Sequence, residues 1–165
     1  MDAQTGTVDG SRLAGAGRLR LAQWLSILVP GALLVGALGS QYLGGLHPCE
    51  MCYWQRWPHW AGLALGGLSF FLPAARRPLV LLAALAIATS GAIGVFHAGV
   101  EWGWWEGLTS CTATGAQTLE DILSSPVVRC DQVQFAVLGL SMAGWNALIS
   151  LSAAGAIAWL TLRRR

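Results

Sequence analysis

The chain contains 165 residues, of which 55% are hydrophobic and only 11% are charged. An ordinary soluble domain carries about 25% charged residues, so this chain has too few to cover a surface that faces water. The composition argues against a soluble globular enzyme, a disordered protein and a nucleic-acid-binding protein. It leaves the class of integral membrane proteins, and a single domain is expected at this length.

Four apolar stretches are long enough to cross the hydrocarbon core of a bilayer, which takes about 20 helical residues. They cover about residues 21–42, 57–72, 79–97 and 135–162. None shows the period-2 alternation of a barrel strand, so each is predicted to be a helix. The sequence therefore predicts an all-α integral membrane protein, a four-helix transmembrane bundle with a long external loop between helices 3 and 4.

The ten basic residues are all arginine, and they are sorted by side. Only Arg56 and Arg129 fall on one side of the predicted spans. The other eight are Arg12, Arg18, Arg20, Arg76, Arg77, Arg163, Arg164 and Arg165. The positive-inside rule places these eight and both termini in the cytoplasm, with external loops at about residues 43–56 and 98–134.

The two ends of the chain are predicted to lie outside the spans. Residues 1–20, rich in Gly, Ala and Arg, are expected to form a mobile cytoplasmic tail, and residues 163–165 a cytoplasmic C-terminus. Residues 21–162 would form the membrane domain. The first apolar run, about 22 residues, exceeds the roughly 7–15 residues of a signal-peptide core, so it is expected to remain as a span.

All four cysteines, Cys49, Cys52, Cys111 and Cys130, lie in the two predicted external segments. On that side of a bacterial-type membrane disulfides form and persist. The first two belong to a C-x-x-C motif in the sequence HPCEMCYWQR at residues 47–56. At the start of a helix the two sulfurs lie one turn apart, and the helix N-terminus stabilises a thiolate.

This motif is typical of dithiol redox chemistry, and Pro48 suits the first position of the helix, where no N–H is needed. A static structural disulfide is an alternative. A metal site is not expected, because zinc takes four ligands of matching spacing, whereas Cys111 and Cys130 are isolated from each other.

Arg56 lies four residues after Cys52, hence on the same helical face, at the outer edge of a predicted span. It could snorkel to the interface, or it could stabilise a thiolate and hydrogen-bond the carbonyl oxygen of a bound oxidant. His59, three residues further on, is expected to be an interfacial histidine.

Cys111 and Cys130 are separated by 18 residues of the long external loop. They could form a structural disulfide that closes the loop, worth about 3 kcal/mol. They could instead be a second exchangeable pair that passes oxidising equivalents to or from the first. The spacing leaves both interpretations open, and an exposed setting favours exchange because attack on a disulfide needs access.

Two outward-facing cysteine pairs on a predicted four-span chain resemble the DsbB family of disulfide-bond formation proteins. The resemblance covers about residues 21–160. It rests on the motifs PCxxCxxQR at residues 48–56, GVFHAGVE at 94–101 and GLSMAGW at 139–145, the last following the loop cysteines.

The resemblance implies a quinone-dependent thiol oxidase of the bacterial inner membrane that reoxidises a periplasmic, thioredoxin-fold protein of the DsbA type. The reduced partner would attack Cys111, whose pairing cysteine would be Cys130. Cys49 would then exchange with the loop pair, and Cys52 would be the thiolate that engages the quinone.

The resemblance also implies a binding site for that quinone, which could be ubiquinone or menaquinone. Arg56 would assist the quinone, and His97 and Met142 are further candidates for the site. Two alternatives remain: an enzyme like vitamin K epoxide reductase, and a non-catalytic membrane scaffold with structural disulfides. The first is disfavoured because its C-x-x-C follows the loop cysteines, whereas here it precedes them.

Overall fold

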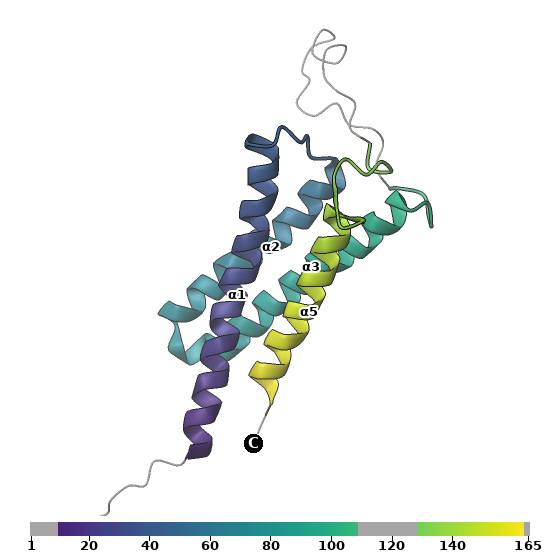
Figure 1. The fold of residues 1–165 in the computed structure, drawn as a ribbon. Helices are drawn as coiled ribbons and strands as arrows, with labels where there is room; N and C mark the ends of the chain where they lie inside the picture. The colour runs from purple at the N-terminus through teal and green to yellow at the C-terminus, as the bar shows by residue number, and fades with distance from the viewer. Residues whose placement is uncertain (1–9, 109–128, 164–165) are drawn as a thin grey trace, which may run out of the picture.

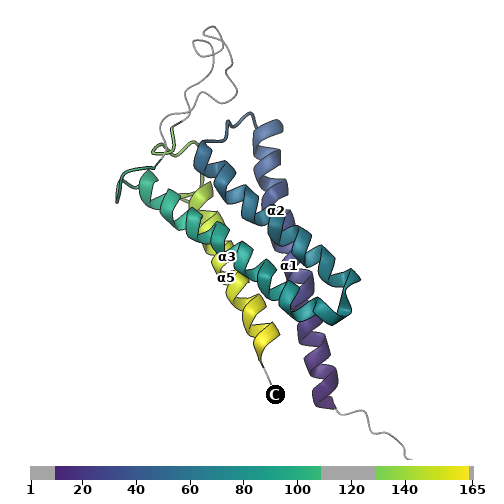
Figure 2. The same cartoon turned by 180° about the vertical axis from the view of Figure 1, so that it is seen from behind.

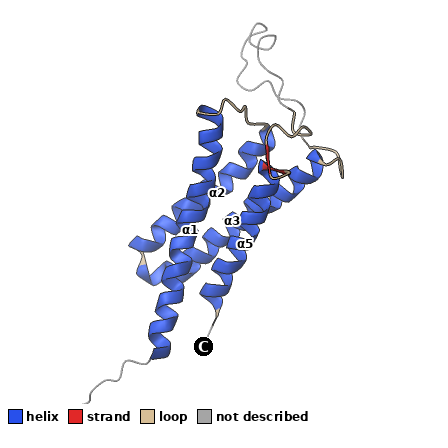
Figure 3. Cartoon of the chain, viewed as in Figure 1, coloured by secondary structure: helices blue, strands red, loops and turns tan. Residues whose placement is uncertain are grey.

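The computed structural model of the chain describes residues 10–108 and 129–163, and Figure 1 traces them. Figure 3 shows that the described part is almost entirely helical. The elements are α1 (Gly10–Tyr42), α2 (Glu50–Phe71), the 3₁₀ helix η1 (Pro73–Ala75), α3 (Arg76–Glu101), β1 (Ala136–Val137), β2 (Leu140–Ser141) and α5 (Met142–Leu162).

The four long helices lie side by side, as the views in Figures 1 and 2 agree. α3 packs against both α2 and α5, and α1 packs against α2 and α5 as well. The first residues of α1 and the end of α5 lie at one end of the molecule. The α1–α2 connection and the segment before α5 lie at the opposite end (Figure 1). Cys49 belongs to that connection, Cys52 to the first turn of α2 and Cys130 to the segment before α5.

Within residues 10–108 and 129–163, three segments are long and apolar enough to cross a membrane. They are Gly15–Tyr42, Pro73–Glu101 and Met142–Leu162, of 28, 29 and 21 residues. α2 has 22 residues but carries Gln55, Arg56 and His59 in its first half, which lowers its mean hydropathy. The prediction of an apolar, helical membrane protein is confirmed by these helices.

The first and last long helices begin at other residues than the predicted spans. α1 begins at Gly10, so the helix includes residues 10–20 of the predicted N-terminal tail, since Leu, Arg and Ala are good helix formers. The last span was predicted from residue 135, but α5 begins at Met142. The Ser141 hydroxyl caps it by accepting a hydrogen bond from the Gly144 amide at 3.1 Å.

The residues before α5 form a β-hairpin instead of a helical turn. β1 and β2 are antiparallel, with Ala136 opposite Ser141. Between them Leu138 and Gly139 have φ angles of 53° and 80°, and two consecutive positive φ angles are typical of the tight type I′ turn. The first predicted external loop is shorter than expected because α2 begins at Glu50, whereas the second is displaced toward the C-terminus because α3 continues to Glu101 and α5 begins at Met142.

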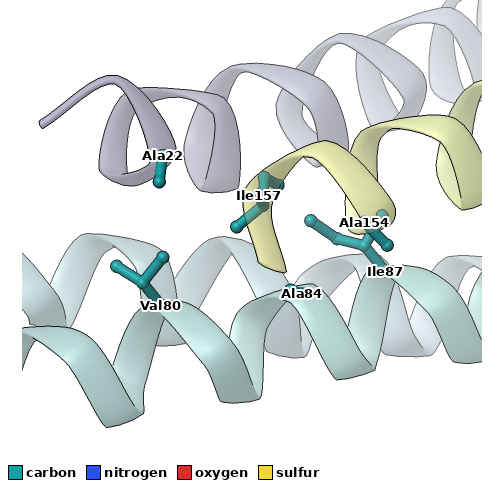
Figure 4. Close-up of a cluster of buried hydrophobic side chains, with 6 residues drawn as sticks. All are labelled: Ala22, Val80, Ala84, Ile87, Ala154 and Ile157. Atoms are coloured by element: carbon teal, nitrogen blue, oxygen red, sulfur yellow. The ribbon is translucent and has the colours of Figure 1, made fainter. Parts of the chain in front are cut away.

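Buried apolar side chains, half of them alanine, pack α1, α3 and α5 together away from the cysteines. Figure 4 shows this cluster, whose members come from all three helices. They are Ala22, Val80, Ala84, Ile87, Ala154 and Ile157, all buried. Close approach of small residues is the usual means of packing helices in lipid, where burial from water gives no driving force.

α1 and α2 touch most tightly at Gly66, which gives a test of the packing. A Cβ on Gly66 would lie 2.7 Å from the Ser26 hydroxyl oxygen and 2.8 Å from the Ser26 carbonyl oxygen, whereas Gly67 has open space. We expect Gly66→Ala to lower the free energy of unfolding by about 1–3 kcal/mol, as overpacking does. Gly67→Ala is the matched control and should be neutral or slightly stabilising. Equal thermal unfolding temperatures for the two variants in detergent would contradict this packing.

Candidate functional site

The site begins at the first turn of α2, where Cys49 is the N-cap residue. Its sulfur accepts a hydrogen bond from the Cys52 backbone N–H at 3.3 Å. The sequence predicted Pro48 at the first helical position. It lies instead one residue before the N-cap. The Cys49 and Cys52 sulfurs lie 2.9 Å apart, so small side-chain movements would join them in a disulfide.

The two cysteines differ in burial and in charge. Cys49 is only 2% exposed, packed with Met51 and Val100, whereas Cys52 is partly exposed. The hydrogen bond to Cys52, together with burial, raises the pKa of the Cys49 thiol far above its usual range. When the pair is reduced, Cys49 therefore keeps its proton and Cys52 is expected to carry the negative charge.

The structure brings Cys130 to the C-x-x-C pair, a proximity that the sequence left open. The sulfurs of Cys49 and Cys130 and a ring nitrogen of His97 all lie within 4.8 Å of one another. Cys130 also packs against the cluster of Cys49, Met51 and Val100. These ligand atoms could hold a thiophilic metal ion, although the sequence predicted no metal. Cys111 lies outside the described residues.

Arg56 links α2 to the end of α1. Its Nη1 donates a hydrogen bond to Gln41 Oε1 at 2.5 Å, and its Nη2 donates to the Ala37 carbonyl oxygen at 3.2 Å. Its guanidinium lies over the Tyr53 ring, 5.2 Å from the centroid, and its positive charge acts on Cys52. The side chain is therefore fixed beside the reactive pair and does not simply snorkel away from it.

A cavity of about 240 Å³ opens beside the cysteines. This is several times the roughly 30 Å³ that one water molecule occupies in the liquid. One wall is apolar and belongs to α1, with Leu33, Leu34 and Ala37. The residues predicted from the resemblance that line the same cavity are Cys49, Cys52, Arg56, His97 and Met142.

A buried polar network reaches from this cavity into the helices, and the sequence analysis missed it. Gln55 Nε2 lies 2.8 Å from His97 Nδ1, and Asn146 Nδ2 donates to Gln55 Oε1 at 2.7 Å. His59 Nε2 and the Ser150 hydroxyl both contact Asn146 Oδ1, at 2.9 Å each. His59 is only 3% exposed, so the expectation of an interfacial histidine was wrong. The available signal was the presence of amides in otherwise apolar helices, which is costly in a membrane unless it serves a site.

Glu101 is a second cavity residue that the sequence analysis did not select. Its carboxylate lies 3.8 Å from His97 Nε2, one helical turn away on α3. Its Oε2 atom is buried and has no hydrogen-bond partner among the described residues. An acceptor in that state is available to a donor group that enters the cavity.

Comparison with known proteins identifies the family. The chain matches the family described as "Disulfide bond formation protein DsbB" over residues 19–160. It is also 20% identical over 142 residues to the uncharacterized protein RP370 of Rickettsia prowazekii (strain Madrid E), a match that covers 81% of this chain and 83% of the relative. No solved structure matches the chain.

The asymmetry of the pair gives a test by alkylation. In the fully reduced protein, iodoacetamide should modify Cys52 before Cys49 at neutral pH. The raised pKa of Cys49 keeps its thiol protonated, and burial keeps it from the reagent. Since a raised pKa preserves the unreactive form as the pH rises, Cys49 should gain reactivity only well into the alkaline range. Peptide mass spectrometry measures both rates, with the unfolded protein as the control in which they converge. Equal rates in the folded protein would contradict the assignment.

Proposed function

The chain belongs to the DsbB family of disulfide-bond formation proteins, and from this we propose that it is a quinone-dependent protein-dithiol oxidase. Its four long helices would form a four-span bundle of the bacterial inner membrane, with residues 21–162 as the membrane domain. Both termini would be cytoplasmic and the cysteines periplasmic. Its partner would be a reduced, thioredoxin-fold protein of the DsbA type.

One observation carries this proposal: a loop cysteine and a C-x-x-C pair meet at the mouth of an apolar cavity. A static disulfide needs only two sulfurs, whereas here Cys130 lies near Cys49 while Cys49 also contacts Cys52. Three sulfurs within exchange distance support a relay over the alternative of a non-catalytic scaffold.

The relay consists of thiol–disulfide exchanges, each of which conserves electrons. A thiolate of the partner attacks Cys111 of the Cys111–Cys130 disulfide, and Cys130 leaves as a thiolate. The Cys130 thiolate then attacks Cys49. A Cys130–Cys49 bond forms, the Cys49–Cys52 bond breaks, and the electron pair of that bond goes to Cys52.

The described residues suit Cys52 as the end point of the exchanges. The positive charge of Arg56 acts on the Cys52 sulfur. Cys52 also lies in the first turn of α2, at the positive end of the helix dipole. Both favour the thiolate. The negative charge is thus held at the wall of the cavity.

The residues that line the cavity are chemically suited to a quinone. Its α1 wall is apolar, as a lipid-soluble ring requires, while Arg56 supplies donors for a carbonyl oxygen. His97 and Met142 complete the lining. A bound quinone would supply the two-electron acceptor that draws oxidising equivalents toward the partner.

Removal of either C-x-x-C thiol should abolish turnover. We expect the purified protein to reduce quinone only when reduced DsbA-type partner is added. Cys49→Ala and Cys52→Ala should each bring that rate to background, because neither variant can form the disulfide that Cys130 attacks. Quinone absorbance measures the rate, and Ser69→Ala, at a buried serine near the other end of α2, serves as the folded control. Undiminished turnover in either cysteine variant would exclude the relay, and no turnover in the unmodified protein would favour the scaffold.

Substitution of Arg56 should act on the quinone and not on the partner. We expect Arg56→Ala to raise the KM for quinone about tenfold, the size of one hydrogen bond to a charged group, with the KM for the partner unchanged. Arg163→Ala is the matched control, because Arg163 also lies over an aromatic ring, that of Trp159, but at the far end of α5. A change confined to the partner KM would show that the role given to Arg56 is wrong.

A further inference from the structure

Two backbone carbonyl oxygens determine which groups donate and which accept in the buried polar network. Asn146 Nδ2 lies 3.1 Å from the Ser90 carbonyl oxygen, and Gln55 Nε2 lies 3.2 Å from the Met51 carbonyl oxygen. A carbonyl oxygen only accepts, so both contacts require an amide NH₂ at these positions. Neither side-chain amide can be turned around without placing two acceptors against each other.

The orientation of Gln55 determines the tautomer of His97. Because Gln55 presents its NH₂ group to Nδ1 at 2.8 Å, Nδ1 must accept, and the hydrogen of the neutral ring is on Nε2. The surroundings of Nε2 agree, since it lies 3.6 Å from the Cys49 sulfur and 3.8 Å from Glu101 Oε1, both acceptors. The backbone of Cys130 is a further hydrogen-bond partner of this ring.

The same direction continues through the cysteines. The Cys49 sulfur receives the Nε2–H of His97 and lies 2.9 Å from the Cys52 sulfur, toward which its own S–H can point. Donors therefore follow one another from Asn146 to Gln55, His97, Cys49 and Cys52. The chain crosses from α5 to α2 to α3 and returns to the start of α2.

We propose that Asn146, Gln55 and His97 form a one-directional hydrogen-bond chain whose last donor, the Cys49 thiol, stabilises the Cys52 thiolate. His97 is the member that touches a reacting sulfur, while Gln55 and Asn146 are positioning residues that hold its tautomer. Each bond polarises the next in a medium of low dielectric constant, so the chain strengthens its final donor. The inference rests on the proposed function in taking Cys52 as the reacting thiolate.

Other charged and titratable groups face this pair, and the chain acts in addition to them. Besides the two cysteines, those lining the cavity are His47, Arg56, His59, His97, Glu101 and Arg129, and Cys130 lies close to Cys49 and His97. Arg56 favours negative charge on Cys52 and Glu101 opposes it. The cavity-lining residues of α1 and α5 within the described ranges contribute no titratable group. Asn146 is uncharged, so its effect on Cys52 can be separated from theirs.

The first test reads the tautomer directly. Imidazole ¹⁵N chemical shifts of the reduced, histidine-labelled protein report which ring nitrogen carries hydrogen, and His97→Asn assigns the signal. We expect Nε2–H and a bare Nδ1 in the unmodified protein. Gln55→Glu presents a carboxylate, which cannot donate, so Nδ1 should then carry a hydrogen. A bare Nε2 in the unmodified protein, or an unchanged ring in Gln55→Glu, would overturn the proposal.

The second test measures the charge on Cys52 through the pH dependence of its alkylation by iodoacetamide. His97→Leu should raise the midpoint of the profile by about half a pH unit, because it removes a hydrogen bond to the neutral Cys49 thiol, which in turn donates to the Cys52 thiolate. Asn146 contacts no sulfur, and Asn146→Leu should raise the midpoint by a smaller amount, because each bond strengthens the next by about 10–30%. Ser69→Ala removes a buried hydrogen bond elsewhere in α2 and should leave the midpoint unchanged.

The outcomes distinguish this inference from the proposed function. Neither measurement uses quinone or partner, so a chain that behaves as described stands even if turnover with quinone is absent. An unshifted midpoint in both His97→Leu and Asn146→Leu would overturn the hydrogen-bond chain while leaving the oxidase proposal intact. The His97 tautomer in the unmodified protein tests the hydrogen-bond chain even where a variant fails to fold.

Discussion

Negative charge on a sulfur next to a membrane needs donors that the protein itself supplies, because lipid has none. In this chain the start of α2 meets that need with the Cys49 thiol and the positively charged Arg56 guanidinium. Each donor is held by another contact: Arg56 by the end of α1, and Cys49 by His97 on α3. The contacts among α1, α2 and α3 at this end therefore hold the groups that surround the Cys52 sulfur.

The two ends of the molecule consequently use different means of packing. Toward the α2–α3 turn, α1, α3 and α5 pack mainly through buried alanine, valine and isoleucine side chains, and Gln23 of α1 donates a hydrogen bond to Ser69 of α2. Toward the cysteines, amides and hydroxyls replace these apolar side chains, and every buried donor there needs an acceptor. Ser90 illustrates this demand, since its hydroxyl donates to the Gln55 carbonyl oxygen at 2.7 Å while its own carbonyl oxygen accepts from Asn146.

The sequence was sufficient for features that depend on local patterns. Long apolar runs predicted the helices, and the C-x-x-C motif followed by Arg56 predicted where the site lies. The start of α5 was missed because Phe135, Ala136 and Val137 are apolar in a hairpin as they would be in a span. Asn146 was missed because its partner Gln55 is 91 residues away, a contact that no local pattern predicts. Cys49 as a cap was missed because a thiol is an unusual N-cap side chain.

The hairpin of β1 and β2 has a consequence for the rate at which Cys130 can react. The hairpin is directly continuous with α5. The segment that contains Cys130 is therefore anchored at Ala136, the first residue of β1. Only residues 131–135 lie between, so Cys130 is six residue steps from Ala136 and at most about 21 Å away. A thiol on so short a tether meets its target at an effective concentration of millimolar order, independent of how much protein is present. The encounter between the loop and the C-x-x-C pair is thereby unimolecular, and dilution should slow only the meeting with the partner.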